Sequence, residues 1–379
     1  MTETITHDEL QELKQSVRGF LERHSTIADV RRLMGSEEGF DASVWDAFAE
    51  QLAFPSLTIP EEYGGAGFGP VAQGIAMEEI GRSLLVAPVL SSSVAATNVI
   101  LSSDDEQAKA ELLPPLAEGT ARGTLAVVEQ TWEQGSSAPT TVAVLDSDGT
   151  WKLTGAKHRV LDGGTATFFV VTAQTADGIG LFVVDRDASG VSTTDVPTVD
   201  LTRSCASVGF TAAPAVALGT TGSAPRAFSA AMDLTAIALA AEQVGAAQGA
   251  LDLTVAYMKL RHQFGRPIGS FQALKHRCAD LHGAIETARA VTSAALRATE
   301  SGDRRRVSIL APLAKTRSWD VLDTVSAQCI QLQGGMGFTW EVDAHLYFKR
   351  ARGNQYVFGD PTALRESAAG SLGLLRSAS

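Results

Sequence analysis

The segment TAIALAAEQVGAAQGALDLTVAYMKLRH (residues 235–262) is rich in alanine and other apolar residues along almost its whole length. This pattern is typical of a helix that is buried on more than one side, as in a four-helix bundle. Two long segments of the same character follow, at residues 273–298 and 305–334. We therefore expect a C-terminal helical bundle over residues 223–379.

The region before this bundle has a different pattern. Four short runs rich in β-branched and aromatic residues are separated by the turn sequences DSDG, DGG and TADG. The runs are TTVAVLD (140–146), WKLTG (151–155), TFFVVTA (167–173) and GLFVVD (180–185). They favour a middle β domain over residues 122–222.

Residues 1–121 are expected to form an N-terminal helical domain, because apolar residues recur there at spacings of three and four. The apolar face of its first helix contains Leu10, Leu13, Val17, Phe20 and Leu21. The glycine-rich sequence PEEYGGAGFGP (60–70) should form a loop between helices, and Pro114 and Pro115 should break the helical pattern again. The expected fold is therefore α+β, with helices, a β domain and a second set of helices in chain order.

Composition excludes several classes of function. The 379 residues carry a net charge of −12, which argues against nucleic acid as the main partner because phosphate binding needs a basic surface. No apolar run reaches the roughly 18–20 residues that span a bilayer, and the N-terminus lacks the pattern of a signal peptide. The three cysteines and the histidines lack metal-ligand spacing, so we expect a cytoplasmic protein without a metal site.

The stretch RHQFGRPIGSFQ (261–272) follows the first long helix of the bundle. Two arginines and a histidine surround an aromatic residue and flexible glycines, which is a combination suited to an anionic ligand. A simpler interpretation is that Arg261 is a solvated cation near the C-terminal end of a helix dipole.

Three segments now resemble those of one family in order and spacing. PEEYGGAGFG (60–69), RHQFGRPIGSFQALKHRCAD (261–280) and QLQGGMGFTWEVDAHLYFKRA (331–351) are similar to signature segments of the acyl-CoA dehydrogenases. The resemblance covers nearly the whole chain and implies a β-barrel-like middle domain and a C-terminal four-helix bundle. It also implies an FAD enzyme in which a carboxylate takes the α-proton of an acyl-CoA thioester while the flavin accepts the β-hydride.

In this family the FAD site spans two subunits. One subunit holds the flavin ring and supplies the base (the cis half), and its neighbour holds the pyrophosphate and adenine (the trans half). The trans half is intact here, since the residues that match it are Arg261, Phe264, Gln272, Gln331, Gly334 and Gly335. Arginine offers planar donors to a pyrophosphate, and glycines let the backbone approach a nucleotide closely.

The cis half departs from the family pattern. In VVEQTWEQGSS (127–137), which matches the family's T-E-P-x-A-G-S-D, only Glu129 is retained. In RVLD (159–162), which matches W-I-T-N, Arg159 replaces the aromatic residue that covers the ring. Leu161 replaces the hydroxyl residue that reaches the flavin.

The catalytic base is also absent from its two family positions. The usual glutamate position holds Phe358, and the alternative position on an early helix of the bundle holds Thr235. Asp360 and Glu242 are the remaining candidates for a displaced base. Asp360 in FGDP is also typical of a turn, and Glu242 in an alanine-rich helix is also typical of a buried, paired carboxylate.

An intact trans half beside a degraded cis half predicts a subunit that completes the flavin site of a partner. The chain resembles the non-catalytic, beta-type subunit of α2β2 acyl-CoA dehydrogenases of actinobacterial type, which act on CoA thioesters of bulky groups such as sterol side chains. Two alternatives remain at this point. One is a self-sufficient homo-oligomeric dehydrogenase with a displaced base, and the other is a non-enzymatic relative that binds a CoA ligand.

Overall fold

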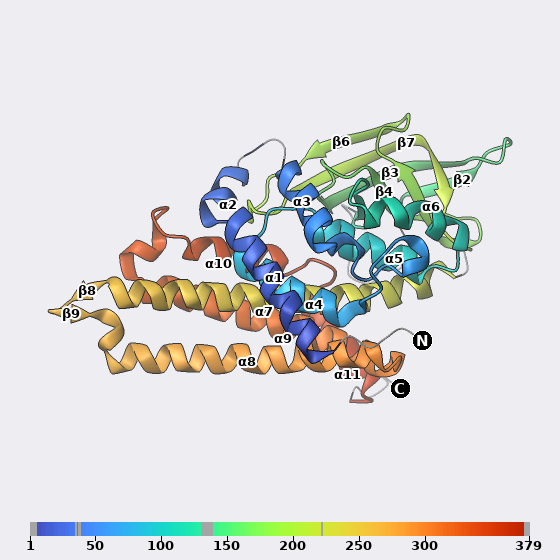
Figure 1. Cartoon of the computed structure of the whole chain (residues 1–379). Helices are drawn as coiled ribbons and strands as arrows, with labels where there is room; N and C mark the ends of the chain where they lie inside the picture. The colour runs from blue at the N-terminus through green and yellow to red at the C-terminus, as the bar shows by residue number, and fades with distance from the viewer. Residues whose placement is uncertain (1–5, 35, 37–38, 130–138, 221–222, 375–379) are drawn as a thin grey trace.

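The structure is a computed structural model that describes residues 6–34, 36, 39–129, 139–220 and 223–374. Its elements follow the predicted order of helices, β-barrel and helices (Figure 1). The barrel lies at the upper right of Figure 1, the N-terminal helices lie beside it, and the long helices of the C-terminal bundle run underneath. The predicted fold is therefore confirmed.

The N-terminal part is built from short helices. They are α1 (His7–His24), α2 (Ile27–Leu33), α3 (Ala42–Leu52), α4 (Gly69–Ser83), α5 (Thr97–Ser102) and α6 (Glu106–Ala117), with the 3-10 turns η1 (Phe54–Ser56) and η2 (Glu61–Tyr63) and the π-helix η3 (Val89–Ala96). Capping boxes at Thr6 and Thr26 start the first two helices. The predicted break at Pro114 and Pro115 was wrong, because both lie inside α6. Burial of the neighbouring Leu113 and Leu116 outweighs the helix bonds that the prolines remove.

The middle part is a closed barrel. Its strands are β1 (Gly123–Ala126), β2 (Val142–Leu145), β3 (Trp151–Leu161), β4 (Phe168–Thr175), β5 (Gly178–Asp185), β6 (Val191–Asp195) and β7 (Cys205–Ala217). β5 pairs with both β4 and β7, and β2 pairs with both β3 and β4, so the sheet returns to its start. Phe169, Phe182 and Phe210 fill its interior, each at most 2% exposed.

The C-terminal part is a bundle of long antiparallel helices. It contains α7 (Ala224–Leu260), the hairpin β8 (His262–Gln263) and β9 (Arg266–Pro267), η4 (Ile268–Ser270), α8 (Gln272–Glu300), α9 (Arg304–Leu332), η5 (Gly334–Phe338), α10 (Ala344–Asn354) and α11 (Pro361–Ser371). By length and composition α7 could cross a membrane, which corrects the expectation that no run was long enough. However, 67% of its most apolar window is buried inside the protein, as befits the central helix of a bundle.

Helix α7 crosses α4 at a contact that only glycine permits. A Cβ added at Gly245 would lie 1.7 Å from the backbone oxygen of Glu78, and one added at Gly81 would lie 1.9 Å from that of Glu242. The two helix backbones therefore touch, and this contact holds the N-terminal helices against the bundle.

We expect Gly245→Ala to destabilise the chain by about 1–3 kcal/mol, because the methyl group forces two rigid helices apart. Gly283→Ala is the matched control, since an added Cβ there, in the middle of α8, meets nothing within 4 Å. That variant should gain roughly 0.4–1 kcal/mol from the smaller backbone entropy of its unfolded state. Denaturant unfolding of both variants checks the prediction, and equal stabilities would contradict it.

Candidate functional site

The two halves of the predicted FAD site lie far apart along α7. Thr235 marks the cis half and Arg261 caps the far end of the helix. At a rise of about 1.5 Å per residue the two positions are roughly 39 Å apart. In one chain the trans residues therefore cannot serve the chain's own cis half.

The antiparallel arrangement brings the two trans segments to one end of the bundle. Helix α7 ends there, α8 begins there and α9 ends there, so RHQFGRPIGSFQ and the segment that begins at Gln331 are at the same end (Figure 1). The sequence predicted these residues as one site although about 60 residues lie between the two segments.

All six trans residues are exposed. Phe264 is 90% exposed, Gly334 has a φ of +63°, and a Cβ added at Gly334 or Gly335 would meet open space. An exposed arginine, an exposed aromatic ring and a bare glycine turn fit the pyrophosphate and adenine end of a dinucleotide presented by another molecule.

The hairpin that carries Phe264 is ordered by its own side chains. The rings of Phe264 and Phe271 meet edge to face with centroids 6.0 Å apart. The guanidinium of Arg266 lies 4.1 Å from the centroid of the Phe271 ring. These contacts fix the hairpin before any ligand binds, which lowers the entropy cost of binding.

In the cis half, Glu129 is fully occupied by structural contacts. Its carboxylate accepts hydrogen bonds from Lys157 Nζ (2.6 Å), Thr140 N (2.6 Å) and Thr141 N (3.0 Å). Burial alone would raise the pKa of Glu129, but these bonds outweigh it and lower the pKa to about 2. The part of VVEQTWEQGSS that follows Glu129, residues 130–137, lies outside the described residues.

The segment RVLD has also become structural. Arg159 is exposed with a φ of +52°, and Leu161 packs among apolar residues that include Leu239 of α7. Asp162 accepts hydrogen bonds from Ser91 Oγ (2.6 Å) and Ser204 Oγ (3.0 Å). Leu161 thus has no hydroxyl to offer a flavin, and the carboxylate of the adjacent Asp162 is already hydrogen-bonded within the chain.

Neither family position for the base holds a proton acceptor that is free to act. Phe358 packs against two hydrophobic clusters of the N-terminal part and the barrel. Thr235 is completely buried, and its hydroxyl donates to the backbone oxygen of Ala231 at 2.8 Å. At the two positions that the resemblance assigns to the base, the side chains are thus a packed ring and a hydroxyl that is hydrogen-bonded within the chain.

Asp360 is the N-cap of α11, as its turn sequence suggested. Its Oδ1 accepts hydrogen bonds from Thr362 N (2.9 Å) and Ala363 N (3.0 Å). The same loop is tied to α9 by Lys315, whose Nζ donates to the backbone oxygen of Gly359 at 2.6 Å. Burial lowers the pKa of Lys315 to about 7. Asp360 is therefore explained by its structural role.

Glu242 is a buried, paired carboxylate rather than a free one. It is 0% exposed and accepts hydrogen bonds from Arg350 Nη1 (2.6 Å) and from Arg203. Arg350 also pairs with Asp200 at 2.7 Å, and Arg203 donates to Asn354. This network joins the barrel to α7 and α10. The sequence suggested that Glu242 needs a partner, but nothing in it identified the partners.

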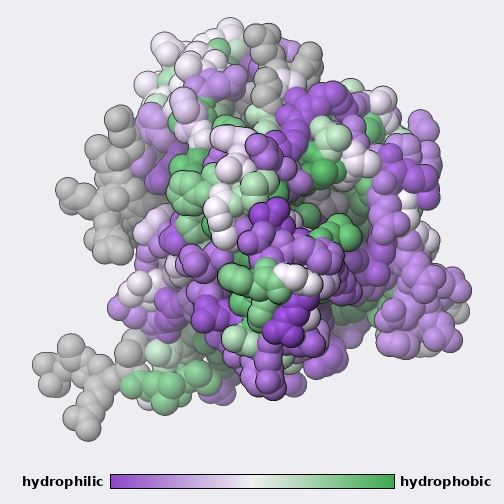
Figure 2. All heavy atoms as spheres, turned by 90° about the vertical axis from the view of Figure 1, so that its left-hand side faces the viewer, coloured by the Kyte–Doolittle hydropathy of each residue, from purple (hydrophilic) through white to green (hydrophobic). Residues whose placement is uncertain are grey.

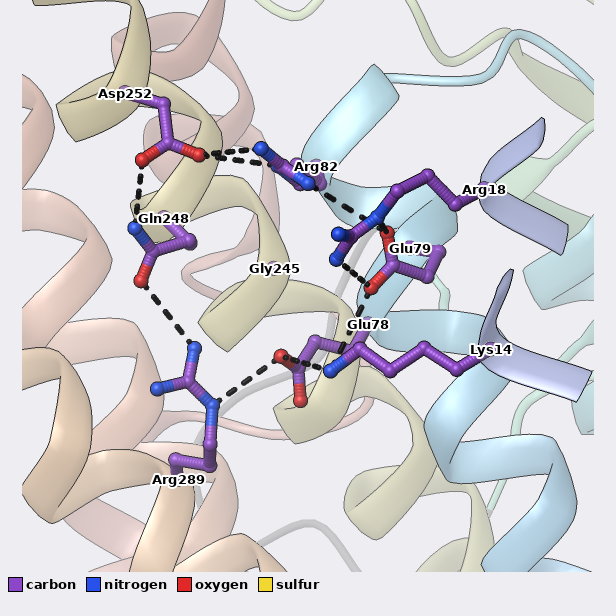
Figure 3. Close-up of a pocket in the computed structure, with 9 residues that line it drawn as sticks. All are labelled: Lys14, Arg18, Glu78, Glu79, Arg82, Gly245, Gln248, Asp252 and Arg289. Carbon is purple, nitrogen blue, oxygen red and sulfur yellow. Dashed lines mark hydrogen bonds and ion pairs between the residues drawn. The ribbon is translucent and has the colours of Figure 1, made fainter. Parts of the chain in front are cut away.

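A polar cleft of about 420 Å³ lies between α1, α4, α7 and α8 (Figure 3). Its acidic residues pair with its basic residues: Glu79 with Arg18 (2.8 Å), Asp252 with Arg82 (2.7 Å) and Glu78 with Arg289 (3.2 Å). Because these charges already have partners, the cleft does not resemble a catalytic site. The ion pairs across it hold the N-terminal helices against the bundle.

Comparisons with known proteins agree with the fold and the motifs. The sequence profiles of the acyl-CoA dehydrogenase N-terminal and C-terminal domains match residues 7–120 and 225–372. Acyl-CoA dehydrogenase IpdE2 of Mycolicibacterium smegmatis is 35% identical over 355 residues, which cover 93% of this chain and 96% of the relative. IpdE2 of Mycobacterium tuberculosis is 36% identical over 354 residues, with coverages of 93% and 94%.

A similar solved structure is a variant of the Tcur3481–Tcur3483 steroid ACAD. It superimposes with a TM-score of 0.86 at 33% identity and covers 97% of this chain and 98% of the solved one. Three findings lead to the same conclusion. Family profiles match both the N-terminal and the C-terminal part of the chain, the relatives match over almost their full length, and the solved structure has the same fold. The chain belongs to the acyl-CoA dehydrogenase family.

Proposed function

We propose that this chain is the non-catalytic subunit of a heterotetrameric acyl-CoA dehydrogenase and completes the FAD site of a catalytic partner chain. Family membership makes FAD the cofactor and places the complex among the flavin-dependent oxidoreductases. The observation that carries the proposal is the contrast between the two predicted half-sites. The trans residues are exposed at one end of the bundle. Of the described cis residues, Arg159 is exposed, whereas Glu129, Leu161, Thr235 and Phe358 are packed or hydrogen-bonded within the chain.

In this arrangement the chain's own residues bind one end of the cofactor. Arg261 donates to the pyrophosphate, and the turn at Gly334 and Gly335 lets the backbone approach it. Phe264 and Gln272 offer an aromatic face and an amide from the same end of the bundle. Bound FAD supplies the acceptor for the β-hydride of an acyl-CoA thioester. The base and the contacts to the flavin ring then come from the partner chain, because Phe358 and Thr235 can supply neither.

The proposed substrate is a CoA thioester of a bulky, sterol-derived acyl group, and the proposed compartment is the cytoplasm. The substrate class rests on similarity to the Tcur3481–Tcur3483 steroid ACAD, which matches this chain over nearly its whole length.

The test is to purify the chain alone and together with a candidate acyl-CoA dehydrogenase chain, and to record flavin absorbance and turnover of both samples. The proposal predicts a colourless, inactive single chain and a yellow, active complex. A yellow single chain with full dehydrogenase activity would contradict the proposal and support the self-sufficient alternative. A complex without flavin would support the non-enzymatic alternative.

The self-sufficient alternative makes its own prediction at Asp360. Asparagine caps helices about as well as aspartate, so Asp360→Asn should preserve folding. If Asp360 were the base, this change would lower turnover by about 10²-fold or more. We expect the turnover of the complex to change less than twofold, as steady-state rates on an acyl-CoA substrate would show.

A further inference from the structure

The glycine turn of the trans half has few contacts of its own. A Cβ added at Gly334 or Gly335 would meet open space, so the turn is placed by the residues on either side of it. On the upstream side, Gln333 is buried, and its Nε2 donates to Thr254 Oγ1 of α7 at 3.0 Å. This hydrogen bond fixes the end of α9 from which the turn starts.

On the downstream side, Trp340 connects the turn to α10. Within η5 only Gly337 is buried, and Phe338 is 88% exposed. The Trp340 and His345 rings meet edge to face with centroids 4.4 Å apart, and Lys349 Nζ lies 4.1 Å from the centroid of the Trp340 ring. Figure 2 faces this end of the molecule, where small hydrophobic patches lie among hydrophilic residues.

Helix α10 is firmly attached to the rest of the protein. Tyr347 Oη donates to the backbone oxygen of Arg82 at 2.8 Å. Arg350 is 1% exposed and pairs with Glu242 of α7. His345 lies in the first turn of α10, so its ring links a fixed helix to the segment that carries the glycine turn.

The surroundings of His345 favour the neutral imidazole. Both ring nitrogens are shielded from solvent, and neither has a hydrogen-bond partner among the described residues. The charged groups that act on the ring are Lys349 of α10, Arg31 of α2 and Asp343 just before α10. Arg31 Nε donates to Asp343 Oδ1 at 2.7 Å, so the acid is already paired. Burial, followed by the charges of Lys349 and Arg31, lowers the pKa of His345 below its ordinary value of 6.5.

We infer that neutral His345 is a positioning residue for the FAD trans half and acts through Trp340 on the glycine turn. The inference rests on the proposed function, and it adds a residue outside the six trans residues and a dependence of FAD affinity on pH. Protonation would place a third cation beside Lys349 and Arg31, with no acceptor for either N–H group. The ring would then leave Trp340 for solvent, and the turn would lose its downstream support.

The direction of the pH dependence follows from this environment. A held His345 resists the proton that a released His345 takes, so the released state gains as the pH falls below 6.5. One pH unit below that value favours release by at most about tenfold. We therefore expect the FAD affinity of the unmodified complex to fall about three- to tenfold between about pH 7.5 and about pH 5.5.

The test titrates the flavin-free complex with FAD at both pH values, followed by flavin fluorescence, for three variants of this chain. His345→Phe keeps an aromatic ring against Trp340 and removes the titrating group, whereas His345→Ala removes the ring as well. His7→Phe replaces an exposed histidine at the start of α1 and is the matched control. Gel filtration at each pH and thermal unfolding of each variant confirm that the complex is intact.

His345→Phe should bind FAD as the unmodified complex does at about pH 7.5 and should keep that affinity at about pH 5.5. His7→Phe should lose affinity with falling pH as the unmodified complex does. His345→Ala should lower the affinity about 2- to 10-fold at both pH values, because the edge-to-face contact is lost.

Three results would overturn this inference and leave the proposed function standing. They are an affinity of the unmodified complex that does not depend on pH, an undiminished fall with pH in His345→Phe, and an unchanged affinity in His345→Ala. A flavin-loaded, active single chain, or a complex that binds no FAD, would instead overturn the proposed function itself.

Discussion

Replacing Arg261 by alanine is expected to lower the affinity of the complex for FAD by about 10- to 100-fold, the effect of losing one charge-assisted hydrogen-bonding group. Replacing Arg159 by alanine is expected to leave that affinity unchanged. Both arginines are exposed, and both match positions that the resemblance assigns to contact with the cofactor. They differ in that Arg261 belongs to the intact trans half and Arg159 to the degraded cis half.

The measurement is a titration of the flavin-free complex with FAD, followed by flavin fluorescence, for both variants. Gel filtration of each variant confirms that the complex still forms, so that a change in affinity reports on the cofactor. Loss of affinity in Arg159→Ala with none in Arg261→Ala would mean that the working half of the site has been assigned to the wrong end of α7.

The second large effect concerns the buried network around Glu242. Glu242→Ala is expected to destabilise the chain by about 3–5 kcal/mol, because it leaves the buried Arg350 and the partly buried Arg203 without their shared partner. Glu12→Ala removes an exposed glutamate on α1 and should change stability by about 0.5 kcal/mol or less.

Urea unfolding, followed by circular dichroism, compares the two glutamate variants with the unmodified chain. A cost below about 1 kcal/mol for Glu242→Ala would show that the network does not hold the barrel to the bundle. Such a result would also reopen Glu242 as a candidate for a displaced base, since its carboxylate would then not be committed to the two arginines.

The sequence predicted the architecture because each part of the chain has its own periodicity. The alanine-rich run became α7, which is buried along most of its length, and the four β-rich runs became β2, β3, β4 and β5. The failure at Pro114 and Pro115 has a physical cause. Proline disfavours a helix locally, but the burial of Leu113 and Leu116 stabilises this helix more than the prolines destabilise it. That burial depends on residues far away in the sequence.

The partners of Glu242 could not be predicted in the same way. Arg203 lies on the loop before β7 and Arg350 lies on α10, and tertiary packing alone brings both to one carboxylate. The sequence indicates that a glutamate in an apolar helix needs a cation, yet many cations were available. In the same way, family motifs indicated which residues contact FAD, whereas the exposure of Phe338 beside them needed the structure.

The number of FAD molecules in the complex tests the central claim most directly. Absorbance of released flavin, divided by the protein content of a purified complex with equal amounts of both chains, gives that number. If this chain contributes only a trans half, each pair of chains holds one FAD. Two FAD molecules per pair would show that this chain also builds a complete cis half, and would contradict the account.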